Sequence, residues 1–156
     1  STLSIHSFPT RRSSDLNRTV DYGAIERFIM AIESKYGVTV MGIGYDRYNA
    51  LSTAQKLEDA GYTMVEIKQH SSVLHPATKW LAELVAEGNL VYEKGNKLLE
   101  INFENSRCVY DTNMNRYVNK KKSRGKVDMV VAGINAMYLL HQNYMLNSAL
   151  DWVVQM

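Results

Sequence analysis

Two aspartates occupy positions at which carboxylates commonly bind ligands. Asp46 directly follows the apolar run 38–45, and Asp128 opens a long apolar segment just after a lysine-rich run. The first run is typical of a buried strand, and in open α/β sheets ligands collect beyond the carboxyl ends of strands. Carboxylates suit Mg²⁺ or Mn²⁺, and two such ions about 3.5–4 Å apart stabilise the attacking and leaving oxygens of a phosphodiester. Both aspartates are therefore candidate metal ligands.

The segment before Asp128 carries the positive charge that chemistry on nucleic acid requires. Its cations are Lys120, Lys121, Lys122, Arg124 and Lys126. Lysine and arginine bind nucleic acid chiefly by neutralising backbone phosphates, so this segment is a candidate DNA-binding surface. The same run is also typical of a solvated loop, and the residue pattern alone leaves both interpretations open.

Both aspartates also have a structural interpretation. An aspartate between a strand and a helix, such as Asp46, is a common turn former, and Asp128 would complement the positive end of a helix dipole. His70 and His75 lack the spacing of a zinc site and Cys108 has no evident partner, so we interpret these three residues as structural. The pattern by itself leaves either role open for both aspartates.

The composition indicates one globular domain. The chain has 156 residues, of which 46% are hydrophobic and 22% charged, with two prolines. Such a chain can bury one sizeable core. The formal charge of +2 identifies no partner, and the single cysteine rules out an internal disulfide framework. No apolar run approaches the roughly 20 residues that cross a bilayer, so we expect no membrane contact.

The spacing of apolar residues predicts alternating helices and strands. Helices are predicted at 21–36, 49–60 (capped by Asn49), 76–87, 97–105 and 127–142, and strands at 38–45, 63–67 and, at an edge, 90–92. Helix, strand, helix, strand with tight connections indicates a parallel α/β layer. The extended pieces 107–111 and 116–119, separated by a polar turn, predict a β-hairpin. After residue 143 we expect a peripheral helix.

The first sixteen residues differ from the rest of the chain. The stretch HSFPTRRSSDL at 6–16 has no helical or strand periodicity and resembles the translation of a sequencing-library adapter. We therefore expect residues 1–16 to be non-native, 17–142 to form the domain and 143–156 to be a C-terminal tail. An ordinary tail is the alternative for 1–16. If the adapter interpretation holds, the natural protein begins further upstream.

Four stretches, taken together, resemble the nuclease domain of the large terminase subunit of tailed bacteriophages. They are GYDRYNA at 44–50, EIKQHSSVLHPATK at 66–79, LLEINFENSRCVYDTNMNRYVNKKK at 98–122 and KVDMVVAGINAMY at 126–138. The similarity covers roughly residues 17–142. Several motifs in the right order and spacing make it more specific than one short match.

This resemblance implies an RNase H-like fold, in which helices flank a mixed sheet with acidic residues on central strands and one helix. It implies a metal-dependent endonuclease that hydrolyses DNA phosphodiesters by a two-metal mechanism, with two Mg²⁺ or Mn²⁺ ions in the intact domain. Asp46 matches the second metal-binding carboxylate of the family and Asp128 matches the last. Lys126 matches the lysine before that last aspartate, which would lie near the DNA phosphates.

The chain departs from the family pattern at its start. The first carboxylate of the family lies on an opening strand, before the helix at 21–36, where this sequence has only the adapter-like segment. Asp15 and Asp21 fit no strand pattern. We therefore expect the sheet to lack its opening strands and this fragment to have little or no nuclease activity.

The resemblance also implies partners and a location. They are double-stranded DNA and, in the full protein, an ATPase domain, the small terminase subunit and the portal, in the host bacterial cytoplasm. No GxxxxGK[ST] motif occurs in these 156 residues. Two alternatives stay open: another RNase H-like nuclease, such as a resolvase or transposase core, or a non-catalytic module that binds DNA or docks on the capsid.

Overall fold

Helices and short strands alternate along most of the chain. The computed structural model describes residues 20–48 and 50–154, with side chains described as far as residue 143. The elements of this part, in order, are α1 (Tyr22–Tyr36), β1 (Ile43–Tyr45), α2 (Leu51–Asp59), β2 (Met64–Glu66), α3 (Ser71–Ala86), α4 (Lys97–Asn105), β3 (Cys108–Tyr110), β4 (Arg116–Val118) and α5 (Asp128–Val154). This order confirms the predicted α/β class. Residues 1–16 lie outside the described part, so the predicted domain limits stay predictions.

The strands pair locally, in two small sheets. β1 and β2 are parallel, with Ile43 opposite Met64, whereas β3 and β4 form the predicted antiparallel hairpin. Within the described part these are two separate two-stranded sheets rather than one mixed sheet. The RNase H-like sheet and its missing opening strands therefore remain predictions.

The first strand is shorter than the sequence predicts. Only Ile43–Tyr45 of the predicted 38–45 enter the ladder with β2. Before them, the backbone N–H of Val40 donates to the Glu33 carboxylate at 2.7 Å. The Glu33 side chain of α1 therefore binds a backbone N–H group that, in a longer strand, could donate to a neighbouring strand.

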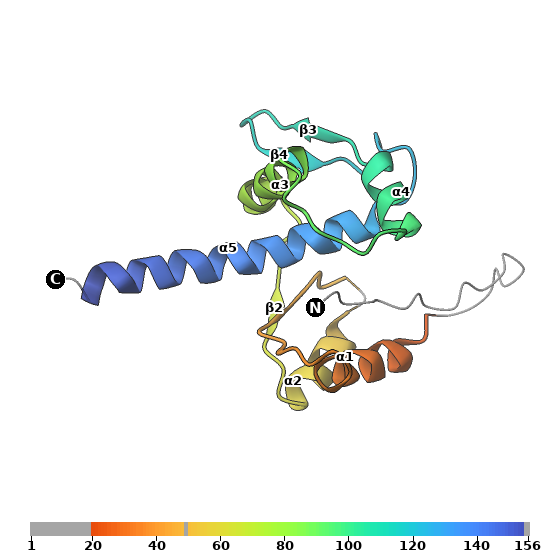
Figure 1. Ribbon diagram of the computed structural model, residues 1–156, viewed down its shortest axis with the longest axis vertical. Helices are drawn as coiled ribbons and strands as arrows, with labels where there is room; N and C mark the ends of the chain where they lie inside the picture. The colour runs from red at the N-terminus through yellow and green to blue at the C-terminus, as the bar shows by residue number, and fades with distance from the viewer. Residues whose placement is uncertain (1–19, 49, 155–156) are drawn as a thin grey trace, which may run out of the picture.

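The long helix α5 organises the packing. It crosses the middle of the molecule, with α1 and α2 on one side and α3, α4 and the hairpin on the other (Figure 1). Ala77 and Leu81 of α3 are buried against Val130 and Ile134 of α5 and form the main core cluster. On the other side, α5 contacts β1. Burial of these apolar faces, rather than sheet pairing, positions the elements.

Gly44 allows β1 to lie close to its neighbours. A Cβ atom there would lie 2.5 Å from Cδ1 of Ile67 and 3.3 Å from Cδ1 of Leu139. Ile67 is 1% exposed, so its side chain has little room to move away. The missing side chain therefore brings the end of β1, and Asp46 just after it, close to α5.

Two further helices and one edge strand differ from the prediction. α3 begins at Ser71 rather than at 76, because the ring of His70 accepts the N–H of Ser72 and caps the helix earlier, so that Pro76 lies inside it. The edge strand predicted at 90–92 is wrong, since this segment is not a strand and Val91 is 91% exposed. α5 continues to Val154 as one helix, so the helix expected after residue 143 is an extension of α5 and not a separate element.

The start of α2 also differs slightly. The helix begins at Leu51 with Ala50 at the N-cap position, and no side chain caps it. The cap predicted at Asn49 lies outside the described residues. Within the described part, no helix has the length and apolar character that crossing a membrane requires.

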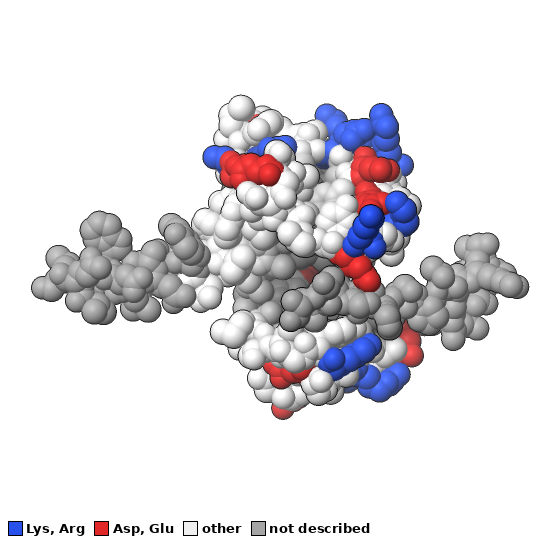
Figure 2. Space-filling view, in the orientation of Figure 1, with Lys and Arg blue, Asp and Glu red and all other residues white. Residues whose placement is uncertain are grey.

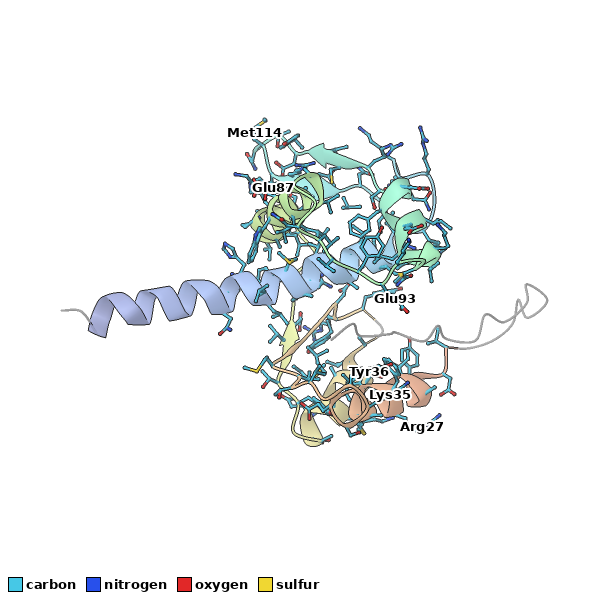
Figure 3. The ribbon with its side chains drawn as sticks, in the orientation of Figure 1. Arg27, Lys35, Tyr36, Glu87, Glu93 and Met114 are labelled. Carbon is cyan, nitrogen blue, oxygen red and sulfur yellow. The ribbon has the colours of Figure 1, made fainter. Side chains whose placement is uncertain are left out.

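Charged side chains are unevenly distributed. In Figure 2, lysine and arginine gather over the side of the molecule that carries α4, with acidic side chains beneath them. The basic segment 119–126 reaches this side, because the N–H of Arg124 donates to the carbonyl of Asn105 at the end of α4. On the other side of α3, the tip of the hairpin carries Met114, at a positive φ of 61° (Figure 3).

Candidate functional site

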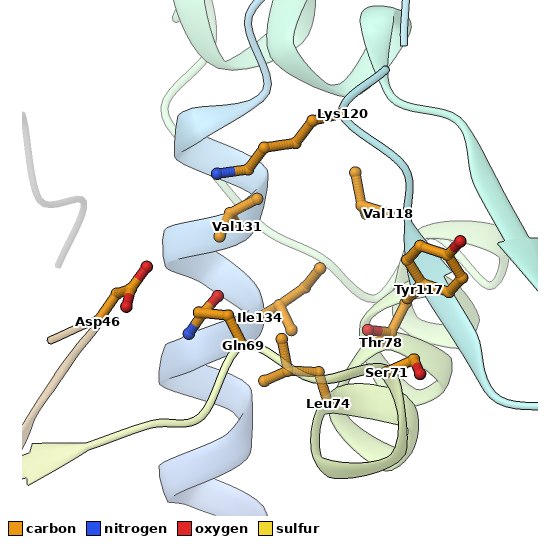
Figure 4. Close-up of a pocket in the computed structure, with 10 residues that line it drawn as sticks. All are labelled: Asp46, Gln69, Ser71, Leu74, Thr78, Tyr117, Val118, Lys120, Val131 and Ile134. Carbon is orange, nitrogen blue, oxygen red and sulfur yellow. The ribbon is translucent and has the colours of Figure 1, made fainter. Parts of the chain in front are cut away.

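A cavity of about 330 Å³ lies beyond the carboxyl ends of β1 and β2, between α3, β4 and α5 (Figure 4). Its apolar wall consists of Leu74, Val118, Val131 and Ile134. Its polar lining consists of Asp46, Gln69, Ser71, Thr78, Tyr117 and Lys120. An apolar wall with a few convergent polar groups at strand ends is a common form of ligand site. The cavity is therefore the candidate site.

Asp46 borders this cavity and also takes part in a local turn. Its side chain is exposed, and Oδ1 accepts the backbone N–H of Tyr48 at 3.3 Å. Through this bond Asp46 has the turn-forming role that the sequence pattern left open. A carboxylate has further lone pairs, so the turn leaves Asp46 able to bind a ligand.

Asp128 is the first residue of α5 and lies outside the lining of the cavity. It is exposed and in the first helical turn, where a carboxylate complements the helix dipole. Val131, three residues later on the same helix face, lines the cavity. Asn135, a further turn along this face, accepts a bond from Gln69 at 3.1 Å. Asp128 is thus one helical turn from the cavity wall.

The start of α5 is held by α4. Asn102 of α4 is 3% exposed, and its Oδ1 accepts the backbone N–H of Met129 at 3.2 Å. Asn105 donates from Nδ2 to the carbonyl of Lys126 at 3.2 Å, and Val127 is buried. The residues on either side of Val127 are therefore held in place by α4.

The donor chemistry at this site fits a hard divalent cation. Mg²⁺ is commonly bound through one or two carboxylates, with water and substrate phosphates completing its shell. Asp46 and Asp128 are of this type. In the part of the chain that the structure describes, no group of three or more His, Cys, Asp or Glu is placed to hold a metal. The carboxylates therefore fit such an ion in kind but do not form a complete set of protein ligands.

The basic segment is an ordered turn with exposed cations. Oδ1 of Asn119 accepts the N–H groups of Lys121 and Lys122, and Ser123 donates to the carbonyl of Asn119 at 2.8 Å. Within the described residues, no ion pair involves any of its five exposed cations, which are Lys120, Lys121, Lys122, Arg124 and Lys126. Their charges are therefore available to a polyanion.

The hairpin is joined to α3 by a carboxylate. Asp111 Oδ2 accepts the hydroxyl of Ser71 at 2.6 Å, and Oδ1 accepts the backbone N–H groups of Asn113 and Asn115 at 2.8 Å each. The Ser71 hydroxyl and the Asn115 amide groups hold the pKa of the Asp111 carboxyl well below its usual range. Asp111 therefore stabilises the hairpin turn and also contacts a helix forty residues away in the chain.

Several cavity residues were not predicted. Gln69 and Ser71 lie between the predicted strand 63–67 and the predicted helix 76–87, and Tyr117 lies in the predicted hairpin. Ligands in open α/β sheets bind beyond the carboxyl ends of strands, and this argument applies to the residues after β2 as well as to Asp46. Gln69 could therefore have been predicted as a site residue. Tyr117 could not, because only the packing of β4 on α3 brings it to the cavity.

Two solved structures share this fold. The crystal structure of the HK97 bacteriophage large terminase matches with a TM-score of 0.66 and 24% identity, over 77% of this chain and 25% of that chain. The large terminase nuclease from thermophilic phage G20c matches with a TM-score of 0.59 and 19% identity, over 76% of this chain and 62% of that one. The chain thus spans a quarter of the first protein and less than two thirds of the second. No curated protein matches it.

These likenesses define an α/β protein with the fold of phage large-terminase nucleases. A family model, described as the endonuclease domain of the terminase large subunit, matches residues 12–143. The match covers most of the chain, so the protein belongs to the family of terminase large-subunit endonuclease domains. The resemblance noted in the sequence is confirmed.

Proposed function

We propose that this chain is the DNA-cleaving part of a phage large terminase, a metal-dependent endonuclease domain that hydrolyses phosphodiesters by a two-metal mechanism. One observation carries the proposal: Asp46 borders the strand-end cavity, and Asp128 lies one turn from the same cavity wall on α5. This arrangement supports a joint role for the two carboxylates. The chain belongs to the family of terminase large-subunit endonuclease domains, and this membership suggests the reaction.

In this proposal Asp46 and Asp128 are the metal ligands. A bound Mg²⁺ or Mn²⁺ supplies positive charge that stabilises the phosphate during hydrolysis. The protein holds the two carboxylates in place. Asn102 of α4 fixes the start of α5, which carries Asp128. The close approach of β1 at Gly44 fixes the end of β1, which Asp46 follows.

The basic segment holds the substrate. Its five exposed cations lie between β4 and α5, and one of them, Lys120, lines the cavity that Asp46 borders. Contacts to phosphates displace counterions, so binding of duplex DNA should weaken steeply with salt. We assign Lys120, Lys121, Lys122, Arg124 and Lys126 to the DNA backbone on this basis.

We also propose that the 156-residue chain cleaves DNA weakly or not at all. A two-metal site needs several carboxylates, and the described residues bring only Asp46 and Asp128 toward the cavity as candidate ligands. The partners of the whole protein follow the same proposal. They are an ATPase domain, the small terminase subunit and the portal, in the cytoplasm of the host bacterium.

The test combines duplex binding with plasmid nicking. We expect the chain to bind duplex DNA with a strong salt dependence, and to nick supercoiled plasmid slowly in Mn²⁺. Asp46→Ala and Asp128→Ala should each abolish this nicking, whereas Asp59→Ala on α2 should not. Failure to bind duplex DNA at low salt would contradict the proposed function. Robust cutting that Asp128→Ala abolishes would instead contradict only the claim of weak activity.

A non-catalytic DNA-binding or docking role is the second candidate, since both aspartates also have structural contacts. Asp46 accepts the N–H of Tyr48, and Asp128 lies in the first turn of α5. In that case the alanine variants would lower stability and leave Mn²⁺ binding unchanged. The other candidate from the sequence, a resolvase or transposase core, is disfavoured by the terminase family match.

A further inference from the structure

The hairpin meets α3 through two hydrogen bonds that local sequence does not explain. The Ser71 hydroxyl donates to Asp111 Oδ2 at 2.6 Å, and Nδ1 of His75 accepts the backbone N–H of Arg116 at 2.7 Å. Ser71 and His75 are four residues apart, so they lie on one face of α3. Asp111 directly follows β3 and Arg116 begins β4. We call these two bonds the hairpin latch.

The bond to Asp111 joins α3 to an ordered turn. The same carboxylate accepts the N–H groups of Asn113 and Asn115 and, at 3.0 Å, the side-chain amide of Asn115. Its pKa lies below the usual range because Ser71 and Asn115 donate to it, so it is ionised at neutral pH. A hydrogen bond to an ionised acceptor is stronger than one between neutral groups. The latch therefore holds a compact turn rather than a single flexible side chain.

The latched strand leads directly to the cavity. Tyr117 and Val118 of β4 line the cavity, and Lys120, two residues beyond the strand, lines it as well. In Figure 4 Lys120 extends toward α5, on whose other side Asp46 lies. The position of this ammonium group depends on where β4 rests on α3.

We propose that Ser71, His75 and Asp111 are positioning residues that hold β4 so that Lys120 contacts a DNA phosphate beside Asp46. This rests on the proposed function, because it assumes that DNA is the ligand. The three residues act through Lys120 and do not themselves contact the substrate phosphate. The latch thus links the start of α3 to phosphate binding at the cavity.

The first test measures the hairpin without DNA. A nitroxide is attached to Met114→Cys at the exposed tip, in a Cys108→Ser background that removes the only native cysteine. Ser71→Ala and His75→Ala should each increase the motion of the label. The matched control Ser72→Ala alters the neighbouring hydroxyl, which hydrogen-bonds to the ring of His70 rather than to the hairpin, and should leave the spectrum unchanged.

Two conservative variants test the bonds themselves. Ser71→Thr keeps the hydroxyl and should restore the slow motion of the label. His75→Asn places an amide oxygen near the position of Nδ1, and so can still accept the N–H of Arg116. The label in His75→Asn should therefore move less than the label in His75→Ala. A loss of fold alone would not produce this rescue.

The second test measures binding of a fluorescent DNA duplex as a function of salt. Lys120→Ala should make the slope of log K against log salt shallower by about 0.9, the value for one phosphate contact. Ser71→Ala should weaken binding toward the level of Lys120→Ala. Combining the two should add little, because both remove the same contact. Lys94→Ala, on the exposed segment before α4, should combine additively with Ser71→Ala.

The outcomes separate the latch from the proposed function. Unchanged label motion in both Ser71→Ala and His75→Ala would overturn the latch, whatever the DNA result. Additive losses for Ser71→Ala and Lys120→Ala would overturn the link to phosphate binding. If the unmodified chain binds no duplex, the proposed function fails and the role of Lys120 with it, while the label result still decides whether the two bonds hold the hairpin.

Discussion

Asn102 of α4 caps a helix to which it does not belong. Its Oδ1 accepts the N–H of Met129 at 3.2 Å, in the first turn of α5, while its Nδ2 donates to the carbonyl of Leu98 at 2.9 Å. The first N–H groups of a helix have no partner within the helix, so this bond satisfies one of them from outside. It also ties the position of Asp128 to α4.

Loss of this cap should destabilise the protein. Asn102→Ala leaves the partly buried N–H of Met129 without its cap, and loss of a helix cap costs about 0.5–2 kcal/mol. We expect a lower urea midpoint with little change in the slope of the transition. Asn89→Ala is the matched control, because Asn89 is exposed and bonds only locally to Glu87. Equal midpoints for the two variants would contradict the assigned role.

A methyl group at position 44 should disturb the contact of β1 with α5. In Gly44→Ala the new Cβ would lie 2.5 Å from the buried Ile67, and such overpacking costs about 1–3 kcal/mol. Gly42→Ala is the control, because its Cβ would meet only ordinary contacts at 3.8 and 3.9 Å. Thermal unfolding of the two variants tests this. A smaller loss for Gly44→Ala than for Gly42→Ala would contradict the packing.

The Asp111 carboxylate should make stability depend on pH. Its pKa is lower in the folded chain than in the unfolded chain, so its contribution is fully present well above pH 4 and declines as pH falls below it. Asp111→Asn removes this contribution. The stability gap between the unmodified chain and the variant should therefore narrow from pH 6 to pH 3 in urea unfolding. A constant gap for Asp111→Asn would refute the assignment.

The two aspartates should share a divalent ion. If both are ligands, Asp46→Asn and Asp128→Asn should each weaken Mn²⁺ binding about tenfold or more, since even the outer partners of ligands have effects of this size. The free Mn²⁺ signal in an EPR titration gives the affinity, and Asp59→Asn should match the unmodified chain. If only one of the two variants loses Mn²⁺ affinity, the two aspartates do not form one site.

Much of the secondary structure could be predicted because it depends on local patterns. α1, α4 and the hairpin appear where apolar spacing and a polar turn indicated them, and β1 and β2 are parallel as the helix–strand alternation implied. Each of these features follows from interactions within a few residues or one short crossover. The four motifs also predicted the family, which the comparisons confirm.

The tertiary structure decided what depends on distant contacts. Only the folded chain shows that β1 pairs over three residues, that Ser71 meets a carboxylate forty residues away, and that the cavity gathers side chains from α3, β4 and α5. The sequence by itself identified Asp46 and Asp128 as candidate metal ligands. It did not determine that Asp128 lies one turn from the wall of the cavity that Asp46 borders, because that relationship depends on how α4 and β1 pack against α5.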